Sequence, residues 1–485
     1  MNKHFKLLII SALFVIGGGD SLCFGQETTE TPEIHDPAEW ISGTLPVLYI
    51  NTENSEEITS KDNYLTGTYY LDALGLEGYE SVGSAEAPLA LQIKGRGNAS
   101  WKYDKKPYRL KLDKKAGLMG MTKSKHFVLL ADVYEVQFRN DNTAFELSRR
   151  LGLDYTPEQH GIELVVNGDY RGFYYLCEKI RVDADHVNIV EQKDEETDPE
   201  AITGGWLVEI DNYAEDNQIT ITDRTNGGKI RFTPQTPEVL STEQQAYLTN
   251  LVTTVDNLIY VDDKDDTRWT DYIDLDALAR YYVLQEVMDN GESFSGSCYW
   301  HKDQGENSKI VFGPVWDFGS ALCHGSVNYQ SFIYDNVPSY AKQRWIGEIA
   351  KFPVFQAKVK EVWSEFRNNC WNGIFDYMDA EKNHISAAIA KDRKRWPQYA
   401  IVSLNGRNSG TQRGLAAKVA WLDQQWGTAT PVTTGVNEVN AAKHVVATTC
   451  YDIDGKQLSS PRQGLNIVVT RYSDGSSQAT KKLVK

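Results

Sequence analysis

The chain has 485 residues, of which 41% are hydrophobic and 24% are charged, and this composition is typical of folded globular proteins rather than disordered chains. The 50 Lys and Arg residues and 67 Asp and Glu residues give a net charge of −17, which disfavours binding to the phosphate backbone of nucleic acids. No HExxH, GxSxG or GxxxxGK[S/T] motif is present, which argues against zinc peptidases, α/β-hydrolases and P-loop proteins. We therefore expect a folded protein with no nucleic-acid partner.

The first residues have the pattern of a secretory signal. Two lysines precede an apolar run at residues 7–17, and small or polar residues follow up to Gly25. This pattern predicts a signal peptide at residues 1–25, and the polar residues 26–44 predict a flexible leader. No later stretch is apolar for long enough to span a membrane. We expect a secreted protein in the periplasm, at the cell surface or outside the cell.

The first half of the chain is predicted to be rich in strands. β-branched and aromatic residues alternate with polar residues between turn signals, which favours strands. The expected strands are residues 45–52, 64–73, 88–98, 108–111, 126–131, 162–166, 170–180 and 205–211. Asn167-Gly168 predicts a tight hairpin turn, since both residues tolerate positive φ. One helix, at residues 138–151, is expected to interrupt these strands.

The second half has helical periodicity. Ser241 and Gln244 form a capping-box pattern ahead of an apolar stripe that ends at Ile259. Further helices are expected at residues 273–288, 353–366, 379–396 and 412–426, with a strand pair flanking residues 302–309. These elements predict an α+β fold with a β-rich N-terminal lobe and a helical C-terminal lobe. A linker at 428–440 and a small all-β, sandwich-like module at 441–485 should follow.

Two basic features could bind phosphate. Lys94-Gly95-Arg96-Gly97-Asn98 follows a strand, and such a turn either holds an anion or simply exposes its cations. Arg109 and Lys111 lie two residues apart on a predicted strand and therefore share one face. That face either reaches the phosphates of a nucleotide or is only solvated.

Two acidic features could bind metal or accept a proton. Asp317, in Trp316-Asp317-Phe318-Gly319, follows an apolar strand and offers a carboxylate suited to Mg²⁺ or, alternatively, to capping a turn. The segment Asp289-Asn290-Gly291-Glu292 ends the helix at 273–288, where Asn and Gly also explain helix termination. Its acids precede Asp317 in the order found in phosphoryl-transfer sites.

The succession of motifs resembles the spore coat protein H (CotH) kinase family. LPVLYINT, LQIKGRGNASW, KKPYRLKLDKK, HFVLLAD, FRNDNTAFELSRRLGL, LVVNGDYRGFYYLCEKIRV, GGWLVEID and VFGPVWDFG occur in this order within residues 45–427. The resemblance implies an atypical, protein-kinase-like bilobal fold. It also implies transfer of phosphate from ATP, with Mg²⁺ or Mn²⁺, to Ser or Thr of exported proteins.

Carried over by position, the resemblance assigns roles to nine residues. Asp317 and Asn290 would bind the metal, and Glu292 or Asp289 would act as the catalytic residue that orients the acceptor hydroxyl. Residues near the nucleotide would be Arg96, Lys106, Arg109, Lys111 and Glu178. If these roles hold, Arg96, Lys111, Glu292 and Asp317 should surround one cleft.

Two positions depart from the family pattern, because Glu292 replaces an Asp and Gly319 replaces the second acid of a WDFD element. A catalytically degenerate surface protein that binds a glycan or protein therefore remains an alternative, as does a hydrolase with paired carboxylates. The binding alternative would be favoured by an exposed row of Trp, of which the chain has 12. The C-terminal residues CYDIDGKQL, GLNIVV and KKLVK resemble sorting tails of proteins exported by Bacteroidetes, which implies outer-membrane export machinery as a partner.

Overall fold

A computed structural model describes residues 34–131, 133, 137–225, 227–319, 321–322, 329–335, 345–400, 403–427, 445–451, 457–458, 462–472 and 477–484. The predicted signal peptide at 1–25, the first part of the leader and the linker at 428–440 lie outside these residues. None of the described helices is long and apolar enough to cross a membrane.

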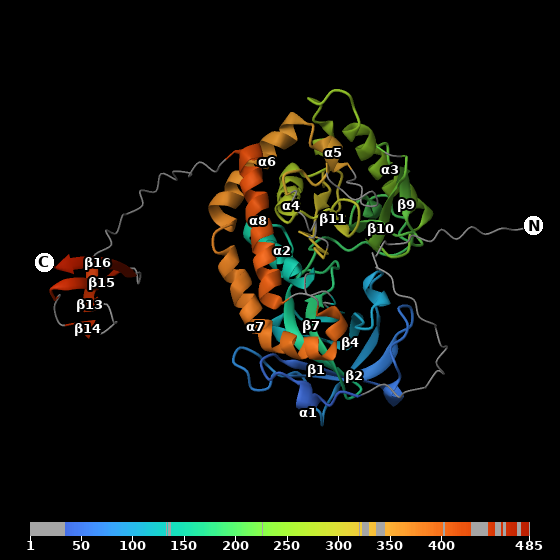
Figure 1. Ribbon diagram of the computed structural model, residues 1–485. Coiled ribbons are helices and arrows are strands. Elements are labelled where there is room, and N and C mark those ends of the chain that lie inside the picture. The colour runs from blue at the N-terminus through green and yellow to red at the C-terminus, as the bar shows by residue number, and fades with distance from the viewer. Residues whose placement is uncertain are drawn as a thin grey trace, which may run out of the picture.

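Seven strands from the first half of the chain close into a barrel in the order β1-β2-β3-β4-β5-β7-β6. Four of them, β1, β2, β4 and β7, are labelled in Figure 1. Parallel pairing of β1 with β6 closes the barrel, and the other neighbouring strands are antiparallel. The strands are β1 (Val47–Thr52), β2 (Leu65–Asp72), β3 (Leu89–Gly95), β4 (Tyr108–Ala116), β5 (Ser124–Leu130), β6 (Gln159–Val166) and β7 (Asp169–Glu178). Closure was not predicted from the sequence, because the β1–β6 contact joins segments more than a hundred residues apart.

Alternation along the strands decides which side chains fill the barrel. Leu110 and Leu112 of β4 lie in the barrel core, so Arg109 and Lys111 between and beside them face outward. The predicted hairpin between β6 and β7 is confirmed, since Asn167 and Gly168 both have positive φ.

A second, five-stranded antiparallel sheet lies in the other half, in the order β12-β11-β8-β10-β9. Its strands are β8 (Trp206–Asp211), β9 (Ile219–Thr222), β10 (Lys229–Thr236), β11 (Cys298–Lys302) and β12 (Val311–Phe312). The β9–β10 hairpin is absent from the sequence-based expectation, although ITIT and KIRF alternate as strands do. The second lobe therefore contains a five-stranded sheet together with its helices, where the sequence predicted a mainly helical lobe with one strand pair.

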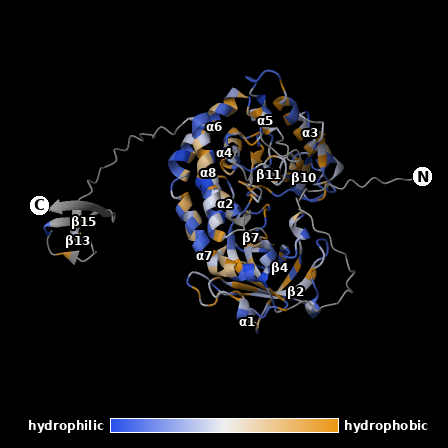
Figure 2. Ribbon diagram, viewed as in Figure 1, coloured by the Kyte–Doolittle hydropathy of each residue, from blue (hydrophilic) through white to orange (hydrophobic). Residues whose placement is uncertain are grey.

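Eight helices surround the two sheets within the described residues (Figure 1). They are α1 (Pro37–Trp40), α2 (Gln137–Leu151), α3 (Thr242–Ile259), α4 (Leu275–Val287), α5 (Ile346–Ile349), α6 (Pro353–Glu365), α7 (Ile374–Arg395) and α8 (Leu404–Trp426). The predicted capping box is confirmed at α3, where Ser241 Oγ accepts from the Gln244 backbone and the Gln244 side chain accepts in return. The helices in Figure 2 carry both hydrophilic and hydrophobic residues, as one-sided packing requires.

A buried ion pair fastens α7 to the barrel. Lys105 Nζ lies 2.6 Å from Asp392 Oδ1, which also accepts from the backbone N–H of Phe173 in β7 at 2.9 Å. The Trp396 indole, just after α7, donates to the Arg171 carbonyl. These contacts hold the helical part against one side of the barrel.

The C-terminal strands form a separate four-stranded sheet in the order β14-β13-β15-β16. They are β13 (Val445–Tyr451), β14 (Gln457–Leu458), β15 (Gly464–Tyr472) and β16 (Ser477–Val484). An all-β arrangement was predicted, but the described strands make one sheet rather than the two layers of a sandwich. Four strands within forty residues leave too little chain for a second layer.

Candidate functional site

A cleft of about 1000 Å³ is lined by residues of the barrel and of the second sheet. The barrel side contributes four cations, and β8, β11 and the nearby turns contribute mainly acids. The cations are Lys61, Lys94, Arg96 and Arg109, and the acids are Glu209, Asp211, Glu215, Glu292 and Asp317. Three lining residues do not follow this separation of charge: Arg231 lies on the acidic side, and Asp62 and Asp141 lie elsewhere on the wall. A cationic wall facing carboxylates suits a ligand that carries phosphate together with a metal ion.

The turn after β3 forms part of the cationic wall because its glycines permit close packing. A Cβ at Gly95 would overlap the Trp101 ring, and a Cβ at Gly97, which has a φ of +82°, would meet the Ser100 hydroxyl. Lys61 Nζ donates to the Gly97 carbonyl at 3.0 Å and fixes the turn from outside. The turn thereby presents Arg96 to the cleft.

Arg96 lies close to the acidic wall. Its guanidinium sits 5.9 Å from the centre of the Trp316 ring, and Asp317 and Tyr299 are charged or ionisable neighbours. Burial lowers the pKa of Arg96, and the field of Tyr299 and Asp317 opposes this. No hydrogen bond or ion pair of the Arg96 side chain occurs within the described residues, so the guanidinium keeps its donors for an anion.

Asp317 is held by its backbone in a sparsely populated conformation with a φ of +56°. Two residues of α2 fix the segment that follows it. Asp141 Oδ1 accepts from the backbone N–H of Phe318 at 2.6 Å, and the Asn140 amide donates to the Ala321 carbonyl at 2.8 Å. The Asp317 carboxylate opens into the cleft, yet desolvation by the cleft walls raises its pKa. Asp317 itself is exposed, and a carboxylate on a strained backbone at a cleft is a common feature of functional sites.

Glu292 lines the same cleft from the turn that follows α4. Its backbone N–H donates to Asn290 Oδ1 at 3.3 Å, and its carbonyl accepts from the backbone N–H groups of Ser295 and Gly296 at 3.1 Å. Asn290 also donates through its amide to the Asp317 carbonyl at 3.5 Å and to Gln285 at 2.9 Å. Asn290, predicted as a metal ligand, does not line the cleft and instead ties the two acidic loops together.

Asp289 points away from the cleft. Its Oδ1 lies 3.0 Å from Nζ of Lys418 in α8, and the same Nζ lies 3.0 Å from Glu286 Oε2. All three side chains are at most 7% exposed. The acids that the sequence places together thus separate: Glu292 faces the cleft, and Asp289 belongs to a buried ionic cluster.

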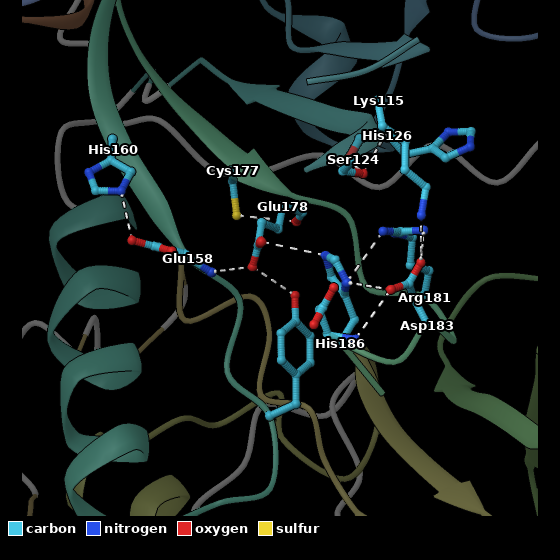
Figure 3. A network of polar contacts seen from close by, with 12 residues as sticks. Lys115, Ser124, His126, Glu158, His160, Cys177, Glu178, Arg181, Asp183 and His186 are labelled. Carbon is cyan, nitrogen blue, oxygen red and sulfur yellow. Dashed lines mark hydrogen bonds and ion pairs between the residues drawn. The ribbon is translucent and has the colours of Figure 1, made fainter. Parts of the chain in front are cut away.

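Glu178 also lies outside the cleft lining, in a buried network at the end of β7 (Figure 3). Its Oε2 accepts from the Tyr155 hydroxyl and from the Glu158 backbone N–H, each at 3.0 Å. Its Oε1 lies 3.4 Å from His186 Nε2, and Figure 3 shows the two side chains pointing toward each other. Its contacts join β7 to the two loops around it.

Two of the predicted basic residues do not face the cleft. Lys106 Nζ donates to the Trp101 carbonyl at 2.9 Å and lies over the Trp101 ring, so it supports the glycine turn. Lys111 is exposed on β4, one strand repeat beyond Arg109, and it is not among the residues that line the cleft. We expected Arg96, Lys111, Glu292 and Asp317 to share one cleft, and this is right for three of them and wrong for Lys111. Lys111 lies two residues along the strand from Arg109, which shifts its side chain by about 7 Å.

Two carboxylates of β8, the half-buried Glu209 and the buried Asp211, complete the acidic wall. Burial raises the pKa of Glu209 to about 8, with Asp211 adding to the shift and a hydrogen bond from Tyr299 opposing it. The Gln235 amide donates to Glu209 Oε2 at 3.2 Å. Asp211 was not predicted, although its alternation with Glu209 in GGWLVEID places both on one face of β8. Lys61, Asp141 and Arg231 carry no sequence signal that distinguishes them.

The residues at the cleft fit a metal ion that arrives with phosphates. No cluster of three or more His, Cys, Asp or Glu side chains arranged to hold a metal occurs among the described residues. Mg²⁺ is usually bound by one or two carboxylates together with water and substrate phosphates. Asp317, with its carboxylate open to the cleft, supplies such an oxygen ligand.

A family model described as CotH kinase protein matches residues 93–425, which is more than half of the chain. The chain belongs to the CotH kinase family. The match contains β4 to β12, the end of β3 and α2 to α7, and it includes all the residues that line the cleft except Lys61 and Asp62. No curated protein matches the chain. The family membership supports a kinase-like function.

Proposed function

We propose that this CotH-family protein is a secreted, metal-dependent kinase that transfers the γ-phosphate of ATP to a Ser or Thr hydroxyl of an exported or surface protein. The observation that carries the proposal is the convergence of Asp317 and Glu292 with Arg96 and Arg109 in one cleft. Phosphoryl transfer depends mainly on positioning and charge stabilisation, and this set of side chains supplies both.

In the proposed reaction, the acceptor hydroxyl oxygen forms a bond to the γ-phosphorus, the bond to the bridging oxygen breaks, and ADP leaves. Glu292 accepts the hydroxyl proton. Backbone hydrogen bonds fix the turn that carries Glu292, so little reorganisation of the turn is needed at the moment of transfer. Arg96 and Arg109 hold the phosphate oxygens through charge-assisted hydrogen bonds.

Asp317 is the proposed ligand for Mg²⁺ or Mn²⁺. A divalent cation bound there would neutralise charge on the phosphates. The contacts from Asp141 and Asn140 fix the Asp317 loop before any ligand arrives, and this preorganisation avoids the cost of ordering the loop during the reaction.

The Asp317→Asn variant tests this proposal, with Asp262→Asn as its control. Asp262 is exposed and lies outside the cleft. Purified mature protein is incubated with labelled ATP, Mg²⁺ or Mn²⁺, and an extract of exported proteins. We expect metal-dependent transfer by the wild type and by Asp262→Asn, and at least a hundredfold loss in Asp317→Asn, on the order of the loss of one charge-stabilising group. Full activity of Asp317→Asn would remove Asp317 from the mechanism.

Glu292→Gln and Asp289→Asn distinguish the two predicted acids. Only Glu292 faces the cleft, so we expect Glu292→Gln to abolish most transfer without weakening ATP binding. Asp289→Asn should act mainly through stability, because Asp289 is paired with Lys418. Equal and specific loss of the chemical step in both variants would contradict this assignment.

The binding-protein alternative lacks a matching surface feature in the described residues. The large hydrophobic side chains exposed there are Ile34, Leu74, Leu89, Val190, Tyr213, Val239 and Tyr272, and no Trp is among them. An exposed row of Trp would have favoured glycan stacking. Absence of both ATP binding and transfer in the assay above would favour this alternative over the kinase.

The proposal includes export, with the C-terminal module as the element that engages outer-membrane machinery. The support is the N-terminal pattern of residues 1–25 and the resemblance of the tail to sorting modules. Fractionation of cells that express the full chain or a chain lacking residues 441–485 tests it. We expect the full chain at the surface or outside and the shortened chain in the periplasm, and the same location for both would refute the role of the tail.

A further inference from the structure

Four cations lie on one outer face of the barrel beside the cleft, and we refer to Lys94, Arg109, Lys111 and Lys179 as the basic face. Strand register places them together. Lys94 of β3 is opposite Arg109 of β4, and Lys111, two residues along β4, is opposite His126 of β5. Lys179 directly follows β7, whose last residue pairs with the neighbour of His126.

The basic face has few counter-charges. No ion pair of its four members occurs within the described residues, whereas the adjacent Lys115 and Arg181 share Asp183 at 3.4 and 2.9 Å. Arg109 Nε is buried and has no hydrogen-bond partner there. Glu238 is the carboxylate whose field favours the charge on both Lys94 and Lys179, but it forms no ion pair with either.

The cations are close enough to repel one another. Burial lowers the pKa of Lys179 to about 8, and Arg109, Arg181 and Lys94 add to the shift. Half-buried cations of this kind are normally paired in proteins. A bound anion would reduce the repulsion between these cations and would accept a hydrogen bond from Arg109 Nε.

The basic face continues out of the cleft. Lys94 and Arg109 line the cleft, whereas Lys111 and Lys179 lie beyond it on the same face. A chain that places a hydroxyl in the cleft would therefore meet these lysines with the residues on one side of that hydroxyl. Lys111 is exposed and Lys179 is half-buried, so both are accessible to such a chain.

We propose that Lys111 and Lys179, the part of the basic face beyond the cleft, bind an acidic segment of the acceptor protein next to the Ser or Thr that enters the cleft, while Lys94 and Arg109 face the cleft itself. This inference rests on the proposed kinase function for the identity of the acceptor. A peptide fits better than a long polyanion, because the protein as a whole carries a net charge of −17 and would repel a polymer that extends beyond the face.

Binding of three fluorescent peptides tests the inference without ATP. Each peptide has one Ser followed by five Glu, five Gln or five Lys, and fluorescence anisotropy measures its dissociation constant at two salt concentrations. We expect the Glu peptide to bind at least about tenfold more tightly than the other two, with an affinity that falls as salt rises. An oligonucleotide of the same net charge should bind more weakly than the Glu peptide.

The Lys179→Met and Lys179→Glu variants test whether the basic face is the surface that binds the Glu peptide. Lys179→Met removes the charge but keeps an unbranched side chain in the half-buried position, so it guards against loss of folding. We expect about fivefold weaker binding of the Glu peptide to Lys179→Met, a larger loss for Lys179→Glu, and no change for the Gln peptide. Lys360→Glu, an exposed lysine on α6, is the control and should bind like the wild type.

The possible results separate this inference from the kinase proposal. Equal binding of the Glu and Gln peptides, equal effects of Lys179→Met on both, or tighter binding of the oligonucleotide would each overturn the acidic-segment inference. Selective binding of the Glu peptide without phosphate transfer to any peptide would leave the basic face as an acidic-peptide site and refute the kinase function alone.

Discussion

Replacing Lys418 by Met should remove the charge that neutralises two buried carboxylates behind the cleft. Lys418 is fully buried, and its Nζ lies 3.0 Å from both Glu286 Oε2 and Asp289 Oδ1 and 2.6 Å from the Ser331 carbonyl. Breaking a buried ion pair by removal of one partner costs about 3–5 kcal/mol, because the remaining charge is left without compensation. We expect a loss in this range from the free energy of unfolding, and the upper end is favoured because two acids share the lysine.

The effect should depend on pH in a defined direction. Burial raises the pKa of Glu286 and Lys418 lowers it, so Glu286 in the variant should bind a proton more readily in the folded state. A folded state that holds more protons than the unfolded state loses stability as pH rises. The difference between Lys418→Met and the wild type should therefore be larger at pH 8 than at pH 5.

Urea unfolding followed by Trp fluorescence measures both effects. Lys360→Met, on the exposed surface of α6, is the matched control and should change stability by no more than about 0.5 kcal/mol. The triple variant Lys418→Met/Glu286→Gln/Asp289→Asn should recover part of the loss, since no charge then remains buried. A loss below about 1 kcal/mol in Lys418→Met, or no recovery in the triple variant, would refute the assignment of a buried ionic cluster.

Three further predictions follow from single positions. The pKa of Glu209 is raised from 4.5 to about 8 in the folded protein, so the wild type should lose stability relative to Glu209→Gln as pH rises between these values. Denaturant unfolding across that pH range measures the free energy of unfolding of both proteins. Parallel curves of this free energy against pH would contradict the prediction. Ser241→Ala removes the cap of α3 and should cost about 1 kcal/mol in the same assay, and no change would mean that the cap is not formed in solution. Gly205→Ala should cost more stability than Gly43→Ala in the same assay. Both glycines have positive φ, but only at Gly205 would a Cβ meet backbone, at the Val190 carbonyl. Equal losses of about 1 kcal/mol would show that backbone strain alone acts.

Local patterns predicted most individual elements. The β6–β7 hairpin follows from Asn167-Gly168 and the start of α3 from its capping box, since each depends on residues close together in the chain. The barrel closure and the second sheet could not be derived in this way, because β1 pairs with β6, and β8 with β11, across long separations. Alternation identifies a strand but does not name its partner.

The candidate site, too, could be predicted from the sequence only in part. The sequence by itself singled out Asp317, Glu292, Arg96 and Arg109 as candidate site residues, and the structure brings these four to one cleft. Only the tertiary structure decided that Asp289, three residues from Glu292, faces Lys418 instead. The reason is that the chain turns sharply after α4, so neighbouring side chains point in opposite directions, and a partner from α8, more than a hundred residues away, compensates the charge of the one that is buried.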